Sequence, residues 1–277
     1  TDTVSTVATL SFADSDFKTI DPAKIPVITT KMSLTNNGMP TITGTAVAGS
    51  KVGLYDGSTL LAMAYADQTG NWTVVPSAKL PEGSHDFVAK TLDSGGNTSL
   101  PSTKLTFVVD TIAPTKPLFS LDAASDTGLS ASDKVTNAKT PKFIGNAEAG
   151  STVTLYEGTT VLGTATPVAG SAGGSFTLTS AALTDGTHVL TVQAKDAAGN
   201  VSIVSEALTV QIDTKAPDTP ATPTLDALSD TGASNSDGIT NKTTPVIKGT
   251  AEAGSKVELF EGTKSIGSAI AGSDGSY

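Results

Sequence analysis

Met39–Gly57 reads MPTITGTAVAGSKVGLYDG, and nearly the same text returns at Thr140–Gly158 (TPKFIGNAEAGSTVTLYEG) and at Thr244–Gly262 (TPVIKGTAEAGSKVELFEG). The shared glycine in each copy recurs after 101 and then 104 residues. A period of this length exceeds any solenoid unit, so each copy belongs to a whole small domain. The sequence therefore predicts a tandem array of similar modules, and its function should be sought in the array and in the junctions between modules.

The repeat sets the expected domain boundaries at 1–110, 111–213 and 214–277. The first module has a degenerate opening segment. The third is truncated, because Tyr277 aligns with Trp72 of the first module, and the last two strands of the pattern are missing. We expect the chain to be a piece of a longer polypeptide.

Composition excludes several classes of protein. The 277 residues are 38% hydrophobic and 5% aromatic, with a formal net charge of −10, so phosphate would be repelled and no nucleic-acid partner is expected. A cation is the natural partner for such a chain. Cysteine is absent. Stability must then come from packing or from metal, although a cytosolic protein without need of disulfides remains the alternative. No apolar run approaches 18 residues, so no membrane span is predicted.

The second module shows the clearest strand pattern. Alternate residues His188, Leu190, Val192 and Ala194 share one face of a predicted strand. Strands are expected at residues 117–122, 141–145, 153–156, 161–165, 175–178, 188–195 and 207–212. Period-2 alternation with regular turn signals predicts an all-β fold of two-sheet, immunoglobulin-like Greek-key sandwiches, about seven strands each. An odd strand count sends the chain in at one end and out at the other, so we expect an elongated rod that gains roughly 35–45 Å per module.

Acidic residues recur where one module meets the next. Asp110-Thr111 and Asp213-Thr214 follow the last strands of their modules, and Asp2-Thr3 opens the chain with the same pair. The alternation of up and down strands brings particular loops to the same end. Glu148, Asp196 and Asn200 are expected to converge on Asp110. Asp126 and Asp133 are expected to approach Asp213. Matching positions in the other modules are Asp93, Asp230, Asp237 and Glu252.

Carboxylates crowded at a joint would repel one another, and a hard cation that prefers oxygen ligands relieves that repulsion. Calcium accepts six to eight oxygens in flexible geometry, whereas magnesium demands a tighter octahedron. Zinc is disfavoured because the chain has no Cys and two His. We therefore expect Ca²⁺ as the cofactor, bound by residues from neighbouring repeats so that the angle between modules is fixed. The alternative is that these aspartates are turn residues whose side chains bond their own backbone.

Two motifs that resemble catalytic motifs are better explained by structural roles in turns and corners of the fold. Asp126-Thr127-Gly128 and Asp230-Thr231-Gly232 spell the aspartic-protease triplet, but they lie in separate modules, whereas an acid pair needs its carboxylates about 3 Å apart. His85 and His188 occupy the same slot after a glycine turn, where sandwich domains place a corner tyrosine that bonds to backbone. Nothing in the segment assembles a nucleophile, a base and a pocket, so no enzyme is predicted.

The combination of DTxAP, SDTGxSxSDxxTN, TPxxxGxAEAGSxVxLxEG and KDAAGN resembles the bacterial immunoglobulin-like repeats of giant, type I-secreted non-fimbrial adhesins of the SiiE-like kind. The resemblance covers almost the whole chain and departs from the pattern at Thr6–Gly38. It implies a monomeric surface fibre of a virulence adhesin, exported without cleavage of an N-terminal signal and stiffened by calcium between repeats.

The expected function is therefore a stalk segment, secreted to the bacterial cell surface, that presents an adhesive tip to a host cell. A rival hypothesis is that these repeats themselves bind a host-cell glycan or protein. A third, that the parent is a carbohydrate-active enzyme with such repeats appended, stays open.

Overall fold

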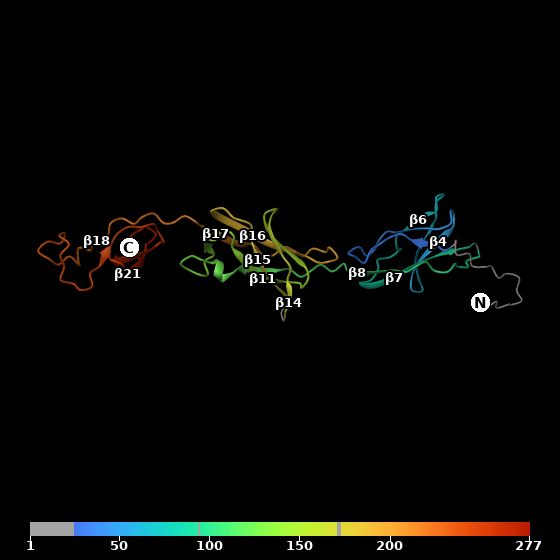
Figure 1. The fold of residues 1–277 in the computed structure, drawn as a ribbon, viewed down its shortest axis with the longest axis horizontal. Coiled ribbons are helices and arrows are strands. Elements are labelled where there is room, and N and C mark those ends of the chain that lie inside the picture. The colour runs from blue at the N-terminus through green and yellow to red at the C-terminus, as the bar shows by residue number, and fades with distance from the viewer. Residues whose placement is uncertain (1–24, 94, 171–172) are drawn as a thin grey trace, which may run out of the picture. The chain divides into compact units, whose positions relative to one another are not determined.

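The computed structural model describes residues 25–93, 95–170 and 173–277. Asp2 therefore lies outside the described residues. The chain divides into two compact units, Thr1–Thr115 with Ala194–Ser202, and Lys116–Gln193 with Ile203–Tyr277. The described elements are strands joined by turns and loops, with one 3₁₀ turn at Ala123–Ser125 (Figure 1).

The first module consists of two sheets, with strand orders β1-β3-β6 and β2-β8-β7-β4-β5. Paired strands run antiparallel except β2 and β8, which are parallel. The strands are β1 (Val27–Ile28), β2 (Leu34–Thr35), β3 (Ile42–Thr45), β4 (Lys51–Asp56), β5 (Thr59–Tyr65), β6 (Asn71–Val74), β7 (Gly83–Leu92) and β8 (Leu105–Val109).

The second module repeats this plan with sheets of order β14-β15-β11-β9 and β10-β17-β16-β12-β13. Its parallel pair is β10 with β17. The strands are β9 (Leu118–Leu121), β10 (Val135–Thr136), β11 (Lys142–Ala147), β12 (Thr152–Glu157), β13 (Thr160–Ala165), β14 (Val168–Gly170), β15 (Gly173–Thr179), β16 (Gly186–Lys195) and β17 (Leu208–Ile212). Each of the seven strands expected from the sequence of this module is confirmed, within a few residues at its ends.

Residues 217–277 form two pairs of antiparallel strands. The first pair is β18 (Thr224–Leu225) with β19 (Ile247–Lys248), and the second is β20 (Lys256–Glu261) with β21 (Lys264–Ile270). The β20–β21 hairpin has the register and the bulge of its counterparts β4–β5 and β12–β13. Its strands are largely exposed, because no further strand of the described chain pairs with β20.

Alternation along the strands builds a core between the two sheets of each complete module. On β16 the predicted face of His188, Leu190, Val192 and Ala194 is buried, which confirms the prediction from period 2. In the first module, the inward residues of both sheets form one hydrophobic cluster that includes Trp72. The fold prediction of tandem, all-β, immunoglobulin-like sandwiches is thus confirmed.

The polar segment that follows the first strand of the second module ends against its last strand. Within this segment, β10 pairs with β17, and the amide of Asp213 donates to the Thr136 carbonyl at 2.9 Å. The first module has the same arrangement, with the Asp110 amide donating to the Thr35 carbonyl at 2.9 Å. The loop between β9 and β10 therefore lies beside the residue at which the chain leaves the module.

Candidate metal centres

Two loops with the sequence pattern SDTGxSxSDxxTN adopt the same hydrogen-bonded conformation. In the second module, Asp126 Oδ2 accepts from the Lys134 amide at 3.2 Å, and Thr127 Oγ1 donates to Asn137 Oδ1 at 2.8 Å. Lys134 is at φ 64°, a left-handed conformation that favours glycine. The loop is thus held closed by its own side chains, and we call it the first acidic loop (residues 125–137).

The third module repeats the arrangement in the second acidic loop (residues 229–241). Asp230 Oδ2 accepts from the Gly238 amide at 3.0 Å, and Thr231 Oγ1 donates to Asn241 Oδ1 at 2.7 Å. Glycine here occupies the left-handed position taken by Lys134 in the other loop, with φ 74°. Two independent copies of one conformation indicate that the sequence pattern itself determines the loop.

Each acidic loop buries a carboxylate oxygen without a donor. Asp126 and Asp230 are 8% and 7% exposed, and no hydrogen-bond donor of the described chain reaches Asp126 Oδ1 or Asp230 Oδ1. A buried anionic oxygen without a partner is costly, because the water that solvated it is not replaced. The same oxygen is buried without a donor in both loops, so this feature follows from the shared sequence pattern.

Other oxygens face the glycine of each acidic loop. A Cβ built on Gly128 would lie 3.0 Å from the Val135 carbonyl oxygen and 3.7 Å from Asp133 Oδ1. The corresponding distances from Gly232 are 3.1 Å to the Ile239 carbonyl oxygen and 3.3 Å to Asp237 Oδ1. Asp133 Oδ1 and Asp237 Oδ1 also accept from the amides of Val135 and Ile239, each at 3.0 Å. Carboxylate and carbonyl oxygens are of the kind that Ca²⁺ takes and offer nothing to a thiophilic metal.

In the turns that follow β7 and β16, unlike in the acidic loops, both carboxylate oxygens of the aspartate accept hydrogen bonds. Asp196 Oδ1 accepts from the amides of Gly199 and Asn200 at 2.7 and 2.8 Å, and its Oδ2 accepts from Asn200 Nδ2 at 2.8 Å. Burial alone would raise the pKa of Asp196, but these hydrogen bonds outweigh it and hold the pKa below the ordinary value of 3.8. Asp93 and Asn97 form the same turn in the first module. Both oxygens of each aspartate are thus already hydrogen-bonded as turn chemistry requires.

The aspartates of the two junctions also bond to local backbone. Asp110 Oδ1 accepts from the Ile112 amide at 3.2 Å, and Asp213 Oδ1 accepts from the Lys215 amide at 3.0 Å. Asn200 Nδ2 donates to the Asp110 carbonyl at 2.8 Å, so the predicted approach of Asn200 to Asp110 is present as a bond to backbone. The local turn alternative therefore accounts for the conformation of both junction aspartates.

The threonine after each junction aspartate is hydrogen-bonded to an acid of the module that precedes the junction. The Thr111 amide donates to Glu82 Oε2 at 2.8 Å, and Thr214 Oγ1 donates to Asp185 Oδ1 at 2.8 Å. Both acids lie in the turn before the strand that begins with glycine, β7 or β16. The sequence analysis missed these two residues, although Glu82 and Asp185 occupy the same position before that glycine and could have been found by aligning the repeats.

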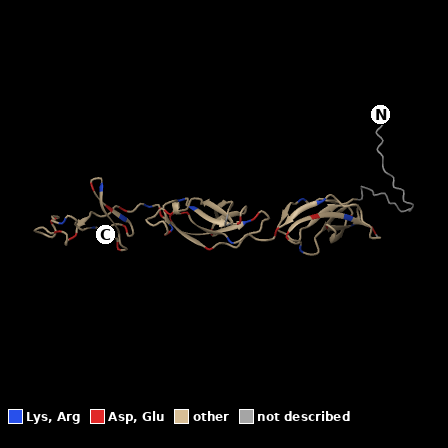
Figure 2. Cartoon of the chain, turned by 90° about the horizontal axis from the view of Figure 1, so that it is seen from below, with Lys and Arg blue, Asp and Glu red and all other residues tan. Residues whose placement is uncertain are grey.

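The expected crowding of three or more carboxylates is not found. Among the described residues, no group of three or more Asp, Glu or His side chains is placed to hold a metal ion. Figure 2 shows acidic and basic residues interspersed along each described part of the chain. Glu148 and Glu252 bond through their carbonyls to the amides of Ser151 and Ser255, and Glu252 Oε2 accepts from the Asp218 amide at 3.3 Å. Metal ligation at any one of these positions stays a prediction.

The predicted histidine corner is confirmed in both complete modules. His85 Nε2 bonds to the Pro81 carbonyl at 2.9 Å, and His188 Nε2 bonds to the Thr184 carbonyl at 2.8 Å. Both rings are buried. Trp72 is also buried, at 2% exposed, and belongs to the core of the first module.

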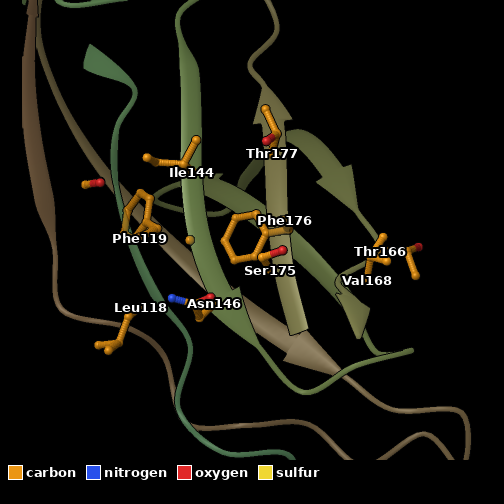
Figure 3. Close-up of a pocket in the computed structure, with 11 residues that line it drawn as sticks. Leu118, Phe119, Ile144, Asn146, Thr166, Val168, Ser175, Phe176 and Thr177 are labelled. Atoms are coloured by element: carbon orange, nitrogen blue, oxygen red, sulfur yellow. The ribbon is translucent and has the colours of Figure 1, made fainter. Parts of the chain in front are cut away.

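A shallow groove of about 790 Å³ lies on the sheet β14-β15-β11-β9 of the second module (Figure 3). Its lining contains no charged side chain and combines aliphatic with hydroxyl and amide groups: Leu118, Phe119, Ser120, Ile144, Gly145, Asn146, Thr166, Val168, Ser175, Phe176 and Thr177. Leu118, Ile144 and Val168 are 64%, 42% and 72% exposed. Position 144 corresponds to Thr43 of the first module, as both directly precede the shared glycine.

The fold and these repeated turns define a class of protein, tandem immunoglobulin-like sandwiches joined by short linkers. A family model described as the bacterial Ig-like domain matches residues 28–111, 113–214 and 217–277. The chain belongs to this family, with three consecutive repeats. A search of the curated proteins finds no match to this chain. No helix among the described residues is long and apolar enough to cross a membrane.

Solved structures with detectable similarity include repeats from large adhesins. A tetra-tandem repeat from the extending region of a large adhesion protein is 20% identical, with a TM-score of 0.28, covering 91% of this chain and 64% of that one. A 1.5-MDa bacterial ice-binding adhesin is 18% identical, with a TM-score of 0.31, covering 89% and 86%. Fibronectin(III)-like modules of Clostridium thermocellum CbhA are 18% identical, with a TM-score of 0.41, covering 68% and 94%.

Proposed function

We propose that this chain is a stalk segment of a bacterial surface adhesin, of the SiiE-like kind, rigidified by calcium at its acidic loops and presenting an adhesive tip to a host cell. Three consecutive bacterial Ig-like repeats support the stalk, because modules in tandem add length to the chain. The observation that carries the calcium is the buried, donor-free carboxylate oxygen of Asp126, repeated at Asp230.

The position of the first acidic loop explains how binding would stiffen the stalk. Its final residues pair with β17, and Asp213, where the chain leaves the module, donates its amide to this loop. A Ca²⁺ ion held by Asp126, Asp133 and nearby carbonyls would fix the loop, and through it the last strand and the start of the linker. The ion would supply charge neutralisation and cross-linking there, with water completing its coordination.

Calcium titration of the intact chain tests this function. Isothermal titration should detect binding at millimolar or lower Ca²⁺, as expected of extracellular modules. Asp126→Asn and Asp230→Asn should each remove one site, whereas Asp122→Asn, at an exposed turn just before the first loop, should remove none. Small-angle scattering should report a narrower distribution of lengths in Ca²⁺ than in chelator. Equal scattering in both solutions would argue against stiffening even if binding occurred.

A second candidate function, direct binding of a host glycan, is favoured by the groove of the second module. Neutral sugars combine apolar faces with hydroxyl groups, and this groove offers exposed aliphatic, hydroxyl and amide side chains without charge. A glycan array probed with the intact chain tests this candidate. Ile144→Thr, which installs the first module's residue, should abolish a genuine signal. Val189→Thr, at an exposed position on the opposite sheet, is the matched control.

A further inference from the structure

Each complete module buries one histidine whose two ring nitrogens both face acceptors. His85 and His188 are 4% and 7% exposed. Beyond the corner bonds of their Nε2 atoms, His85 Nδ1 lies 2.6 Å from Asp56 Oδ2, and His188 Nδ1 lies 2.8 Å from Glu157 Oε1. Each histidine thus bridges two segments of its module, the backbone of the corner and the acid that ends β4 or β12.

These contacts determine how many protons the cluster holds. A carbonyl oxygen only accepts, so Nε2 must carry a hydrogen, and an ionised carboxylate only accepts, so Nδ1 must carry one as well. The ring is then an imidazolium next to a carboxylate. If the carboxyl group of Asp56 or Glu157 held the second proton and donated it to Nδ1, the ring and the carboxyl group together would still hold the same number of protons. A neutral ring beside an ionised acid would leave one acceptor facing a lone pair.

The charges around each ring support the protonated form. Burial by itself lowers the pKa of His85, but the hydrogen bonds to Asp56 and to the Pro81 carbonyl outweigh it and raise the pKa above 6.5. Asp86, the next residue, directs its own carboxylate to Lys104 Nζ at 3.0 Å and to Thr106 Oγ1. The other groups packed on His85 are the rings of Phe87, on its own strand, and of Phe107, across the sheet on β8.

The environment of His188 has the same character. Burial lowers its pKa, and the bonds to the Thr184 carbonyl and to Glu157 outweigh burial and raise the pKa above 6.5. Asp185, in the preceding turn, is engaged by Thr214. Across the sheet, the residue paired with His188 is Val210 of β17, which is apolar. Glu157 is therefore the charged partner of His188, as Asp56 is of His85.

We propose that His85 and His188 are proton-dependent clasps, in which the protonated ring fastens the β4–β5 or β12–β13 hairpin to the corner that precedes β7 or β16. The clasp stabilises each module fully at pH below 6.5, the ordinary histidine value. Its contribution is lost as the pH rises through the higher value of the folded state, because the folded module binds the proton more tightly than the unfolded chain. In a stalk built of such modules, each module is most stable at mildly acidic pH and becomes less stable at alkaline pH.

Nuclear magnetic resonance of the intact chain tests the clasps directly, since these are its two histidines. Long-range ¹H–¹⁵N spectra should show both ring nitrogens protonated at pH 6.5 in both residues, with titration midpoints above that value. A single neutral tautomer at pH 6.5, or a midpoint at or below it, would overturn the proposal for that module. This measurement on the natural sequence is independent of any variant that fails to fold.

Paired variants separate the clasp from general electrostatics. Glu157→Gln should lower the titration midpoint of His188 and leave that of His85 unchanged, and Asp56→Asn should do the reverse. The control Glu206→Gln removes an exposed acid that is bonded to Lys116 and should move neither midpoint. Urea denaturation from pH 6 to 9 should show stability falling with pH in the natural chain and a flatter profile in His188→Gln. An unchanged slope in that variant would contradict the role assigned to the ring.

Discussion

The ring of Phe176 lies over Gly145, its partner on the neighbouring strand, so that a Cβ built on Gly145 would come 2.5 Å from Phe176 Cζ and 2.2 Å from the Leu118 carbonyl oxygen. Trp72 covers Gly44 in the first module in the same way, with a contact of 2.1 Å. The glycine that marks the repeat in the sequence is therefore required by an aromatic residue about 30 residues later and by the backbone of the first strand.

Gly145→Ala should destabilise the second module by roughly 1–3 kcal/mol, because the added methyl group must displace both the ring and a backbone oxygen. Chemical denaturation monitored by circular dichroism measures this loss. Gly170→Ala is the matched control, since the nearest atom of the described residues to its Cβ would be 3.6 Å away and its backbone is not left-handed. Equal stability of the two variants would show that the ring can move aside at no cost.

Ser102→Ala should lower the free energy of unfolding of the first module by about 1–3 kcal/mol. Ser102 is buried, and its Oγ accepts from the Ala89 amide at 2.9 Å while donating to the Thr103 carbonyl. The variant leaves a buried amide on β7 without its acceptor. Thermal unfolding of the intact chain should show the loss, whereas Ser132→Ala, at an exposed position in the first acidic loop, should not.

Acid should loosen the turn at Asp196. Because the pKa of Asp196 is lowered in the folded chain, the carboxylate contributes stability above about pH 3.8, and this contribution is lost as the pH falls through the folded-state value. Hydrogen exchange should report falling protection factors for the amides of Gly199 and Asn200 in this range. Protection that persists after the carboxylate is protonated would mean that the turn holds without its charge.

The regular strands were predictable because their side chains alternate between core and solvent, as on β16. Two short strands were missed. Val135–Thr136 lies in a polar segment and is a strand only because its backbone pairs with β17, a long-range contact without a periodic signal. Val168–Gly170 is a strand through its antiparallel pairing with β15, which no periodic signal in the sequence marks.

The candidate site was predictable in part. Recurrence of Asp126 and Asp230 at equivalent positions indicated a shared role, and the structure shows what they share, an oxygen that is buried without a donor. Sequence could not show that Asp110, Asp196 and Asp213 accept from backbone amides within a few residues, and their ligation of a metal stays a prediction. Strand direction places loops at one end of a module, but it does not say which donors each carboxylate meets there.

Thermal unfolding of the intact chain in Ca²⁺ and in chelator, for the natural sequence and for the double variant Asp126→Asn with Asp230→Asn, tests the central claim most directly. Calcium at ten to a hundred times its dissociation constant should stabilise the natural chain by about 1.4–2.7 kcal/mol per site and raise its melting temperature, and it should leave the double variant unchanged. Identical melting of the natural chain in Ca²⁺ and in chelator would contradict the account.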